Sequence, residues 1–172
     1  SYGSGSFEIA NVLQFNRVDY LTVAYADEGI ELRRNGITVP IMVMNPEQRS
    51  FEAMIHYNLE PEIYTLSLFD RFVEVLALLK NGSSEPYKIH IELETGMNRL
   101  GFTEEELPAL IERIQLNHQV QIASVFSHLA ASEDKDYDDF TKEQIKNFER
   151  MSAQLTGAFS YPILRHILNS TG

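Results

Sequence analysis

Polar side chains that could do chemistry follow three apolar segments of the chain. The stretch Glu94 to Arg99 holds a carboxylate, an amide and a guanidinium group, and it comes directly after the segment Lys88 to Leu93. His128 ends a second apolar segment, and Asn169 and Ser170 follow a third. Imidazole and carboxylate groups move protons near neutral pH, and guanidinium groups bind anions. We therefore expect these three places to form one binding or catalytic site.

Alternating polar residues precede the first of these loops and allow two interpretations. His90, Glu92 and Glu94 are two residues apart, so on a strand they share one face. In the favoured interpretation, the guanidinium group of Arg99 neutralises one of the buried carboxylates. In the other, His90, Glu92, Glu94 and His128 bind a divalent metal ion, because imidazole and carboxylate ligands suit such ions.

Two further motifs are weaker indications of a site. The segment Gly3 to Ser6 precedes a helical pattern and could bind a phosphate through free N–H groups, although an ordinary turn with an N-cap is the favoured interpretation. The acidic run Glu133 to Asp139 resembles a calcium loop only superficially. Its sixth position is Asp139 where glycine is needed, and its twelfth is Ile145 where glutamate is needed, so we predict a solvated loop.

The composition excludes several classes of protein. The chain has 172 residues, with 14 Lys and Arg against 25 Asp and Glu, a net charge of -11 and no cysteine. This acidic balance argues against nucleic-acid binding, and the lack of cysteine rules out disulfides and thiolate metal sites and fits a cytoplasmic protein. The longest apolar runs, such as Val75 to Leu79, are far shorter than the roughly 20 residues that span a bilayer.

Predicted strands and helices alternate along the chain. The predicted strands are Tyr20 to Val23, Ile41 to Met44, Glu62 to Thr65, Lys88 to Leu93, Gln121 to Ser127 and Ile163 to Leu168. The predicted helices begin at Ser6 as an N-cap and continue with Glu28 to Arg34, Pro46 to Tyr57, Leu68 to Lys80, Thr103 to Leu116 and Thr141 to Thr156. Thr103 with Glu106 forms a capping box, and Asn35 with Gly36 ends a helix.

This alternation predicts an α/β fold with about six parallel strands, either an open doubly wound sheet or a (β/α)8 barrel. A barrel needs about 250 residues and eight strands. The chain begins at Ser1 in a loop that leads into a helix and stops at Gly172 just after a strand. We therefore expect residues 1–172 to be a single, incomplete (β/α)8 TIM barrel domain that lacks its first and last strands, and we expect it to aggregate when isolated.

Three motifs at the strand ends together resemble alanine racemase. They are Glu94-Thr95-Gly96-Met97-Asn98-Arg99-Leu100-Gly101-Phe102, Ser127-His128-Leu129-Ala130 and His166-Ile167-Leu168-Asn169-Ser170. The first residues are similar to the family's Tyr-Gly-x-Gly segment, and the likeness runs from end to end. The resemblance implies a pyridoxal 5'-phosphate (PLP) barrel of fold type III, followed by a C-terminal β domain that this chain does not include.

The resemblance implies a role for five residues. Tyr2 and Ser170 would hydrogen-bond the cofactor phosphate from two sides. Arg99 would contact the phenolic oxygen of the cofactor and approach the substrate carboxylate. His128 would stack beside the pyridine ring, and His166 would orient an arginine further along the chain. Tyr2, Arg99, His128, His166 and Ser170 are therefore the predicted cofactor-binding residues, and Arg99 is also the predicted substrate-binding residue.

By the same resemblance, the groups that move protons lie outside these residues. The lysine that holds the cofactor would precede Ser1 by three positions, an arginine would follow Gly172, and a tyrosine would come from the C-terminal domain of the partner subunit. Glu92 stands where many members carry a carbamylated lysine, and Glu94 replaces the usual aspartate. We therefore predict no catalytic residue and no metal ligand here, and no activity for the chain alone.

The implied function is the interconversion of L- and D-alanine for cell-wall synthesis by a cytoplasmic homodimer that contains PLP. Three alternatives stay open: a racemase of broader amino-acid specificity, a homologue without catalytic activity, and a metal-dependent barrel enzyme built on His90, Glu92 and His128.

Overall fold

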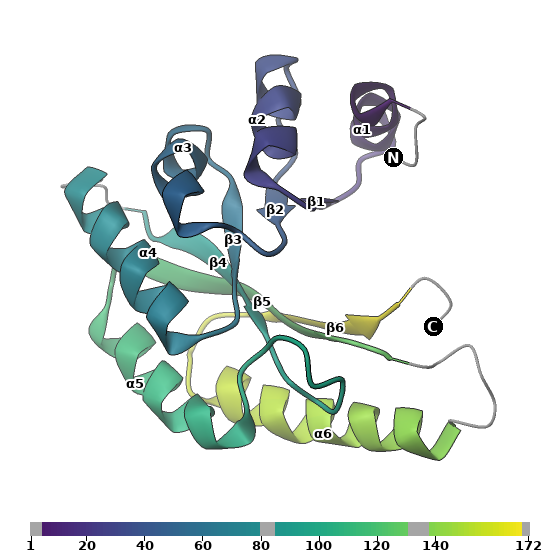
Figure 1. Cartoon of the computed structure of the whole chain (residues 1–172), viewed down its shortest axis with the longest axis vertical. Helices are drawn as coiled ribbons and strands as arrows, with labels where there is room; N and C mark the ends of the chain where they lie inside the picture. Colours follow the sequence, from purple (N-terminus) through teal and green to yellow (C-terminus); the bar gives the residue numbers. More distant parts are fainter. Residues whose placement is uncertain (1–4, 80–84, 131–137, 170–172) are drawn as a thin grey trace. The chain divides into compact units, whose positions relative to one another are not determined.

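The computed structural model describes residues 5–79, 85–130 and 138–169 (Figure 1). These residues divide into two compact units, of which the first comprises 5–62 and 70–79 and the second comprises the remainder. The elements are α1 (Ser6–Phe15), β1 (Leu21–Val23), α2 (Ala26–Arg34), β2 (Ile41–Val43), η1 (Gln48–Ser50), α3 (Phe51–His56), β3 (Glu60–Ile63), α4 (Leu66–Leu79), β4 (Tyr87–Glu92), η2 (Glu104–Glu106), α5 (Leu107–Leu116), β5 (Val120–His128), α6 (Asp138–Gly157) and β6 (Leu164–Leu168). Among the described residues, no helix has the length and apolar character needed to cross a membrane.

The first unit is built on parallel strands that pair in chain order. Leu21 pairs with Ile41 in β1 and β2, and Val43 pairs with Pro61 in β2 and β3. The side chains of Ile41 and Val43 are fully buried, as expected for a parallel sheet covered by helices. Phe51 of α3 and Phe72 of α4 complete this core with an edge-to-face contact, their ring centroids 5.2 Å apart.

Arg33 joins two loops of this unit. From α2 its guanidinium group donates hydrogen bonds to the carbonyl oxygens of Ile37 and Val39, at 2.8 and 2.7 Å, and of Tyr57 and Asn58, at 3.1 and 3.2 Å. Five donors in a fixed planar arrangement make arginine suited to several carbonyls at once. One side chain therefore fixes the segment before β2 and the segment before β3.

The third strand begins earlier than predicted. The prediction of Glu62 to Thr65 is wrong, because β3 covers Glu60–Ile63 with Glu60 and Glu62 buried on it. Tyr20 hydrogen-bonds to Glu60, and the carboxylate of Glu62 accepts the backbone N–H of Asn45. Burial and the Glu60 carboxylate together raise the pKa of Tyr20 to about 12. Charged residues and a proline are unfavourable in a buried strand, and these tertiary hydrogen bonds offset part of that cost.

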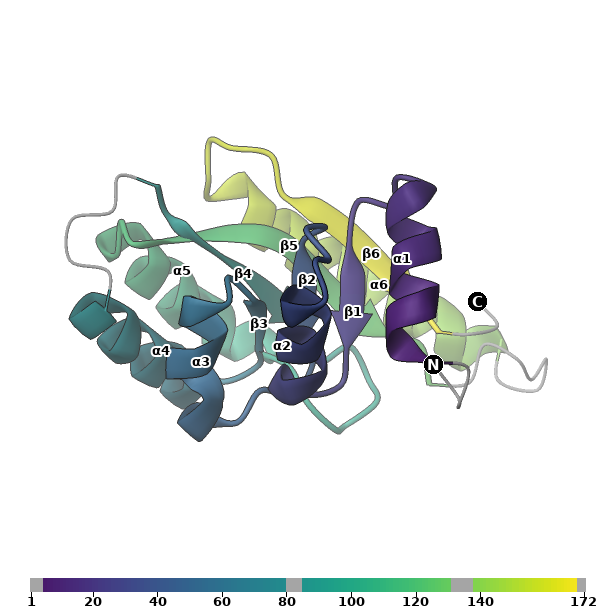
Figure 2. The ribbon, with the colours of Figure 1, turned by 90° about the horizontal axis from the view of Figure 1, so that it is seen from above.

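The second unit contains β4, β5 and β6, which are also parallel and also pair in chain order (Figure 2). The helices α5 and α6 lie on one face of these strands (Figure 1). The pairing of β4 with β5 shifts at Ile89 and His90, which pair with Ile122 and Ser124 and leave Ala123 between them. Downstream of this irregularity, His90 and Glu92 share a face with Ser124 and its neighbours on β5 and β6.

Helix starts account for most of the other differences from prediction. Gly5, with φ of 81°, is the N-cap of α1, so the predicted N-cap Ser6 is the first helical residue. The helix predicted from Glu28 begins at Ala26, because the Glu28 carboxylate caps it by accepting the N–H groups of Ala24 and Tyr25.

The capping box predicted before α5 is confirmed, since Glu106 accepts the N–H of Thr103 at 2.9 Å. The prediction of an incomplete (β/α)8 barrel is also confirmed. Within the described ranges, six parallel strands alternate with helices, and the strands of each unit pair in chain order. A doubly wound sheet would reverse this order at a switch point.

Candidate functional site

The loop after β4 is folded around the carboxylate of Glu94. Its two oxygens accept the backbone N–H groups of Gly96, at 2.5 Å, and of Arg99, at 3.1 Å. Asn98 adopts a left-handed conformation with φ of 56° and donates its amide to the carbonyl of Gly96 at 3.2 Å. The interpretation that the Arg99 guanidinium neutralises one of the carboxylates is therefore wrong for Glu94. Local backbone N–H groups satisfy this carboxylate, which leaves the exposed guanidinium without an ion pair to any described residue.

Gly101 closes the loop against the end of β4. Its φ of 118° lies in the region that favours glycine, and a Cβ atom there would lie 2.5 Å from the backbone nitrogen of Glu94. Immediately after it, Phe102 pairs with the strand end, because its N–H donates to the carbonyl of Glu92 and its own carbonyl accepts the N–H of Glu94. The two ends of the Arg99 loop are thus fixed to the same strand.

The end of β5 is held by amide side chains from two neighbouring elements. Gln144 of α6, which is fully buried, accepts the N–H of Ala130 at 3.0 Å and donates to the carbonyl of His128 at 3.2 Å. Asn169, next to β6, donates to the carbonyl of Leu129 at 3.1 Å. The imidazole ring of His128, by contrast, is half-buried and makes no hydrogen bond to another described side chain.

A hydrogen-bonded pair of hydroxyl groups connects the two strand ends. The hydroxyl oxygens of Thr95 and Ser127 lie 2.7 Å apart, and both residues are buried. The carbonyl of Thr95 also accepts the side-chain amide of Asn147 at 3.3 Å. The loop that carries Arg99 and the strand end that carries His128 are therefore joined directly, and each also contacts α6.

The metal cluster that was left open as the alternative interpretation, with His90, Glu92, Glu94 and His128 as ligands, does not form among these described residues. Nδ1 of His90 lies 2.7 Å from the hydroxyl of Ser124, and Nε2 of His166 lies 3.4 Å from that same hydroxyl. The ring of His166 is stacked on Phe126, with centroids 5.1 Å apart and planes 3° apart. Burial and, to a smaller extent, His90 lower the pKa of His166. Over the parts of the chain that the structure describes, no three His, Asp or Glu residues are arranged to bind a metal ion.

Three of the five predicted cofactor-binding residues can be located. Arg99, His128 and His166 all lie in the second unit, the first two at the carboxyl ends of β4 and β5 and the third within β6. Tyr2 and Ser170 lie outside the described residues, as do Gly3 and Ser4 of the segment Gly3 to Ser6 and residues 133–137 of the acidic run Glu133 to Asp139.

Five polar residues that support this site were not predicted from the sequence, namely the buried Thr95, Ser124, Ser127 and Gln144 and the half-buried Asn147. The signal for two of them was present. Gln144 and Asn147 are three residues apart next to the apolar Phe148, so they share a helix face that is expected to be partly buried.

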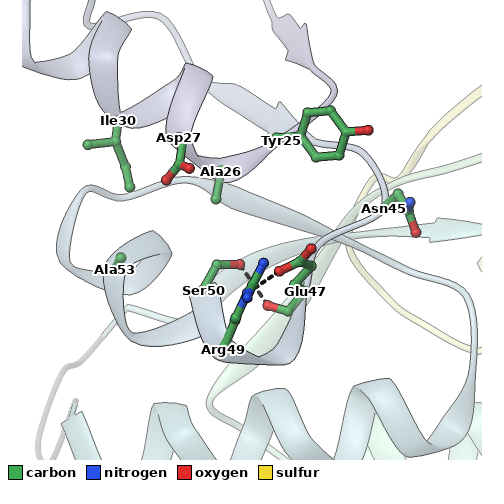
Figure 3. A pocket seen from close by; sticks show the side chains of 9 residues that line it. All are labelled: Tyr25, Ala26, Asp27, Ile30, Asn45, Glu47, Arg49, Ser50 and Ala53. Atoms are coloured by element: carbon green, nitrogen blue, oxygen red, sulfur yellow. Dashed lines mark hydrogen bonds and ion pairs between the residues drawn. The ribbon is translucent and has the colours of Figure 1, made fainter.

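A separate pocket of about 470 Å³ lies in the first unit, beside the carboxyl ends of β1 and β2 (Figure 3). Tyr25 and Asp27 at the start of α2 face the segment that carries Asn45, Glu47 and Arg49. The Arg49 guanidinium is paired with the Glu47 carboxylate, as Figure 3 shows, and both side chains are largely exposed. Arg99, His128 and His166, the located residues that are predicted to bind a cofactor, do not line this pocket.

The groups in the second unit suit an anionic ligand that has a flat ring. Arg99 offers a guanidinium group whose charge is not offset by Glu94, and His128 offers an imidazole face on the adjacent strand end. Guanidinium groups donate paired hydrogen bonds to anionic oxygens, and imidazoles pack against planar rings. The described residues therefore fit PLP, which is a planar pyridine with a phenolic oxygen and a phosphate.

Comparisons with known proteins give one consistent result. The sequence profile of the family described as "Alanine racemase, N-terminal domain" matches residues 1–172. The chain is 36% identical to alanine racemase of Thermodesulfovibrio yellowstonii over all of its length and 44% of that protein. It is 34% identical to alanine racemase 2 of Caldanaerobacter subterraneus subsp. tengcongensis, over 99% of the chain and 43% of that protein.

A solved structure agrees with these matches. Alanine racemase of Clostridium difficile 630 superposes with a TM-score of 0.86 at 32% identity, over 99% of this chain and 43% of that one. The chain thus spans less than half the length of each of these proteins.

Proposed function

Because the chain belongs to the alanine racemase N-terminal-domain family, we propose that it forms the cofactor-holding part of a PLP-dependent alanine racemase. The single observation that carries this proposal is the arrangement of Glu94 and Arg99. The loop is stabilised by Glu94 through backbone N–H groups only, so the charge of Arg99 is available to an anionic oxygen of the cofactor or the substrate.

Four predicted cofactor-binding residues each have a defined part in this proposal. Arg99 donates hydrogen bonds to the phenolic oxygen of the cofactor and to the substrate carboxylate. His128 packs its ring against the pyridine ring, while Tyr2 and Ser170 donate to the phosphate. When bound, PLP stabilises negative charge at the Cα atom of an amino acid, which is the chemistry that racemisation requires. The residues of this chain bind and orient the reactants.

Two further groups tune this arrangement in our proposal. Glu92, on β4, supplies a permanent negative charge that orients Arg99, in place of a modified lysine. His166 orients an arginine that is not among these residues. The groups that exchange protons with the substrate also lie elsewhere in the intact protein, on the cofactor-binding lysine and on a tyrosine of a partner subunit, so we expect residues 1–172 alone not to racemise alanine.

The wider setting is part of the same proposal. The intact protein would act as a homodimer in the cytoplasm and supply D-alanine for peptidoglycan. The incomplete barrel would be closed by strands from the rest of the polypeptide, with a C-terminal β domain after it. The share of each relative that this chain covers, 43 to 44% in the two sequences compared, supports this division.

The test is an assay of the intact polypeptide that contains residues 1–172, purified with PLP and given L-alanine. We expect the optical rotation of the solution to fall to zero as D-alanine forms. The Arg99→Ala variant should lower kcat/KM by about 100-fold or more, because one preorganised donor typically contributes this much. Arg71→Ala is the matched control, since Arg71 is an exposed arginine of α4 whose ion pair among the described residues is with Glu74.

Other results would contradict the proposal in different ways. If the intact protein bound PLP but racemised serine faster than alanine, the substrate assignment would be wrong and the cofactor assignment would stand. If it did not bind PLP at all, the cofactor-holding role would be wrong.

A further inference from the structure

Gln144 contacts the loop that carries Arg99 and the strand end that carries His128. Its side-chain amide pairs with the backbone on both sides of Leu129, accepting the N–H of Ala130 at 3.0 Å and donating to the carbonyl of His128 at 3.2 Å. The amide thus makes the two backbone hydrogen bonds that a neighbouring strand would make, at a point where β5 has ended. Since Gln144 itself is fully buried, its amide depends on these protein partners for its hydrogen bonds.

The apolar part of the same side chain lies against the Arg99 loop. A Cβ atom built on Gly96 would lie 3.4 Å from Cγ of Gln144, which is van der Waals contact, so the Gln144 side chain packs beside this loop. One helical turn further along, Asn147 donates its amide to the carbonyl of Thr95 at 3.3 Å. One face of α6 therefore contacts both the loop after β4 and the end of β5.

We propose that Gln144 is a positioning residue of the racemase site, which sets the place of the His128 ring relative to the Arg99 guanidinium. This inference rests on the proposed function, because it gives the two positioned groups a shared ligand. Gln144 does not touch that ligand. It acts through the backbone of His128 and Ala130 on one side and through Gly96 on the other.

The physical reason is that α6 supplies hydrogen-bond partners at a point where β5 no longer pairs with another strand. Beyond its last ladder pair, the end of a strand has no partner to fix its backbone, and a loop rich in glycine is no stiffer. A buried amide that satisfies one donor and one acceptor removes this freedom, because breaking either bond leaves the buried amide group without a partner, which is unfavourable. Misplacing a reacting group by about 1 Å can lower a rate by about 100-fold.

Three variants separate positioning from simple stability. Gln144→Leu keeps the volume of the side chain and removes both hydrogen bonds. Gln144→Glu keeps an acceptor for Ala130 and loses the donor to His128, so it serves if the leucine variant does not fold. Gln154→Leu is the matched control, because this substitution makes the same chemical change at an exposed position of the same helix.

The experiment uses the intact protein and two readouts besides activity. The first is the dissociation constant of PLP, followed by fluorescence, and the second is the imidazole nitrogen NMR signal of His128 in the protein without PLP. For Gln144→Leu and Gln144→Glu we expect PLP binding to weaken by about tenfold or more and the His128 signal to shift or broaden. Gln154→Leu should change neither.

Two outcomes would count against different parts of the argument. If the Gln144 variants only lower the melting temperature, with PLP affinity and the His128 signal unchanged, Gln144 is structural and the inference is wrong. If the unmodified protein does not bind PLP, the proposed function fails. The His128 signal of the variants then still reports whether Gln144 positions that ring.

Discussion

The carboxylate of Glu94 accepts the backbone N–H of Arg99 at 3.1 Å, and the guanidinium group of Arg99 takes no part in that contact. Two residues of opposite charge, five positions apart, are therefore close without forming an ion pair. The carboxylate is used to shape the loop, and the positive charge remains exposed at the end of β4. This separation of tasks makes it possible to disturb one of the two residues without directly altering the other.

Removing the Glu94 carboxylate should loosen the loop. In Glu94→Ala the N–H groups of Gly96 and Arg99 lose their acceptor, which should cost about 1 to 3 kcal/mol. Hydrogen exchange measured by NMR or mass spectrometry should show faster exchange at these two amides. Glu105→Ala, an exposed change in the adjacent η2, is the control, and equal exchange in both variants would contradict the role given to Glu94.

A second prediction concerns three glycines that differ in strain and in space. Gly101→Ala combines a φ of 118° with a contact of 2.5 Å to the backbone of Glu94, so it should lower the free energy of unfolding by about 2 kcal/mol or more. Gly36→Ala, with a φ of 90° and open space, should cost less. Gly157→Ala has neither problem and should be nearly neutral. Chemical denaturation of the three variants measures the order, and any other order would show that the close approach at Gly101 is not the dominant cost.

The hydrogen bonds of the Arg33 guanidinium group should contribute far more to the free energy of unfolding than its charge does. Arg33→Lys keeps the charge and cannot reach the four carbonyls together, so we expect a loss of about 2 to 3 kcal/mol in the free energy of unfolding. Arg71→Lys, which changes an exposed ion pair, should lie within about 0.5 kcal/mol of the unmodified protein. Equal losses in the two variants would mean that the carbonyl contacts add nothing.

The lowered pKa of His166 predicts a dependence of stability on pH. The folded protein favours the neutral ring, whereas the unfolded chain takes up a proton near the ordinary pKa of 6.5. Stability from this residue is therefore present above that pH and is lost as the pH falls. Relative to His166→Phe, which keeps an aromatic ring beside Phe126, the unmodified protein should lose stability between about pH 7.5 and about pH 5.5. Urea unfolding at both pH values measures the difference, and a constant difference would contradict the attributed burial.

Local sequence patterns predicted the alternation of strands and helices well, because that signal lies in apolar periodicity and in caps such as Thr103 with Glu106. They failed where a tertiary contact replaced a local preference. Glu60 and Glu62 have the residue type of a protein surface, yet inside the unit Tyr20 hydrogen-bonds to Glu60 and the N–H of Asn45 donates to one carboxylate oxygen of Glu62. No periodicity can show a partner that is some 17 to 40 residues away in the chain.

In the candidate site, too, some features could be predicted from local sequence and others depend on tertiary structure. The motifs at the strand ends identified Arg99 and His128, since reactive groups of parallel α/β folds follow the carboxyl ends of strands. The sequence did not reveal that Glu94 would bind backbone N–H groups, because Gly96 and Asn98 first have to adopt positive φ angles to bring those groups round it. Nor could it reveal the hydroxyl pair of Thr95 and Ser127, which depends on the pairing of β4 with β5.

The extra residue in β5 has a consequence for changes in chain length. Ile89 pairs with Ile122 and His90 with Ser124, so Ala123 has no counterpart on β4, and the pairing of β5 with β6 begins only at Ser124. Deleting Ala123 would therefore leave both ladders in their present alignment, whereas deleting any later residue of the strand would turn its side chains to opposite faces. Ala123 is thus the position at which this strand can shorten without moving His128.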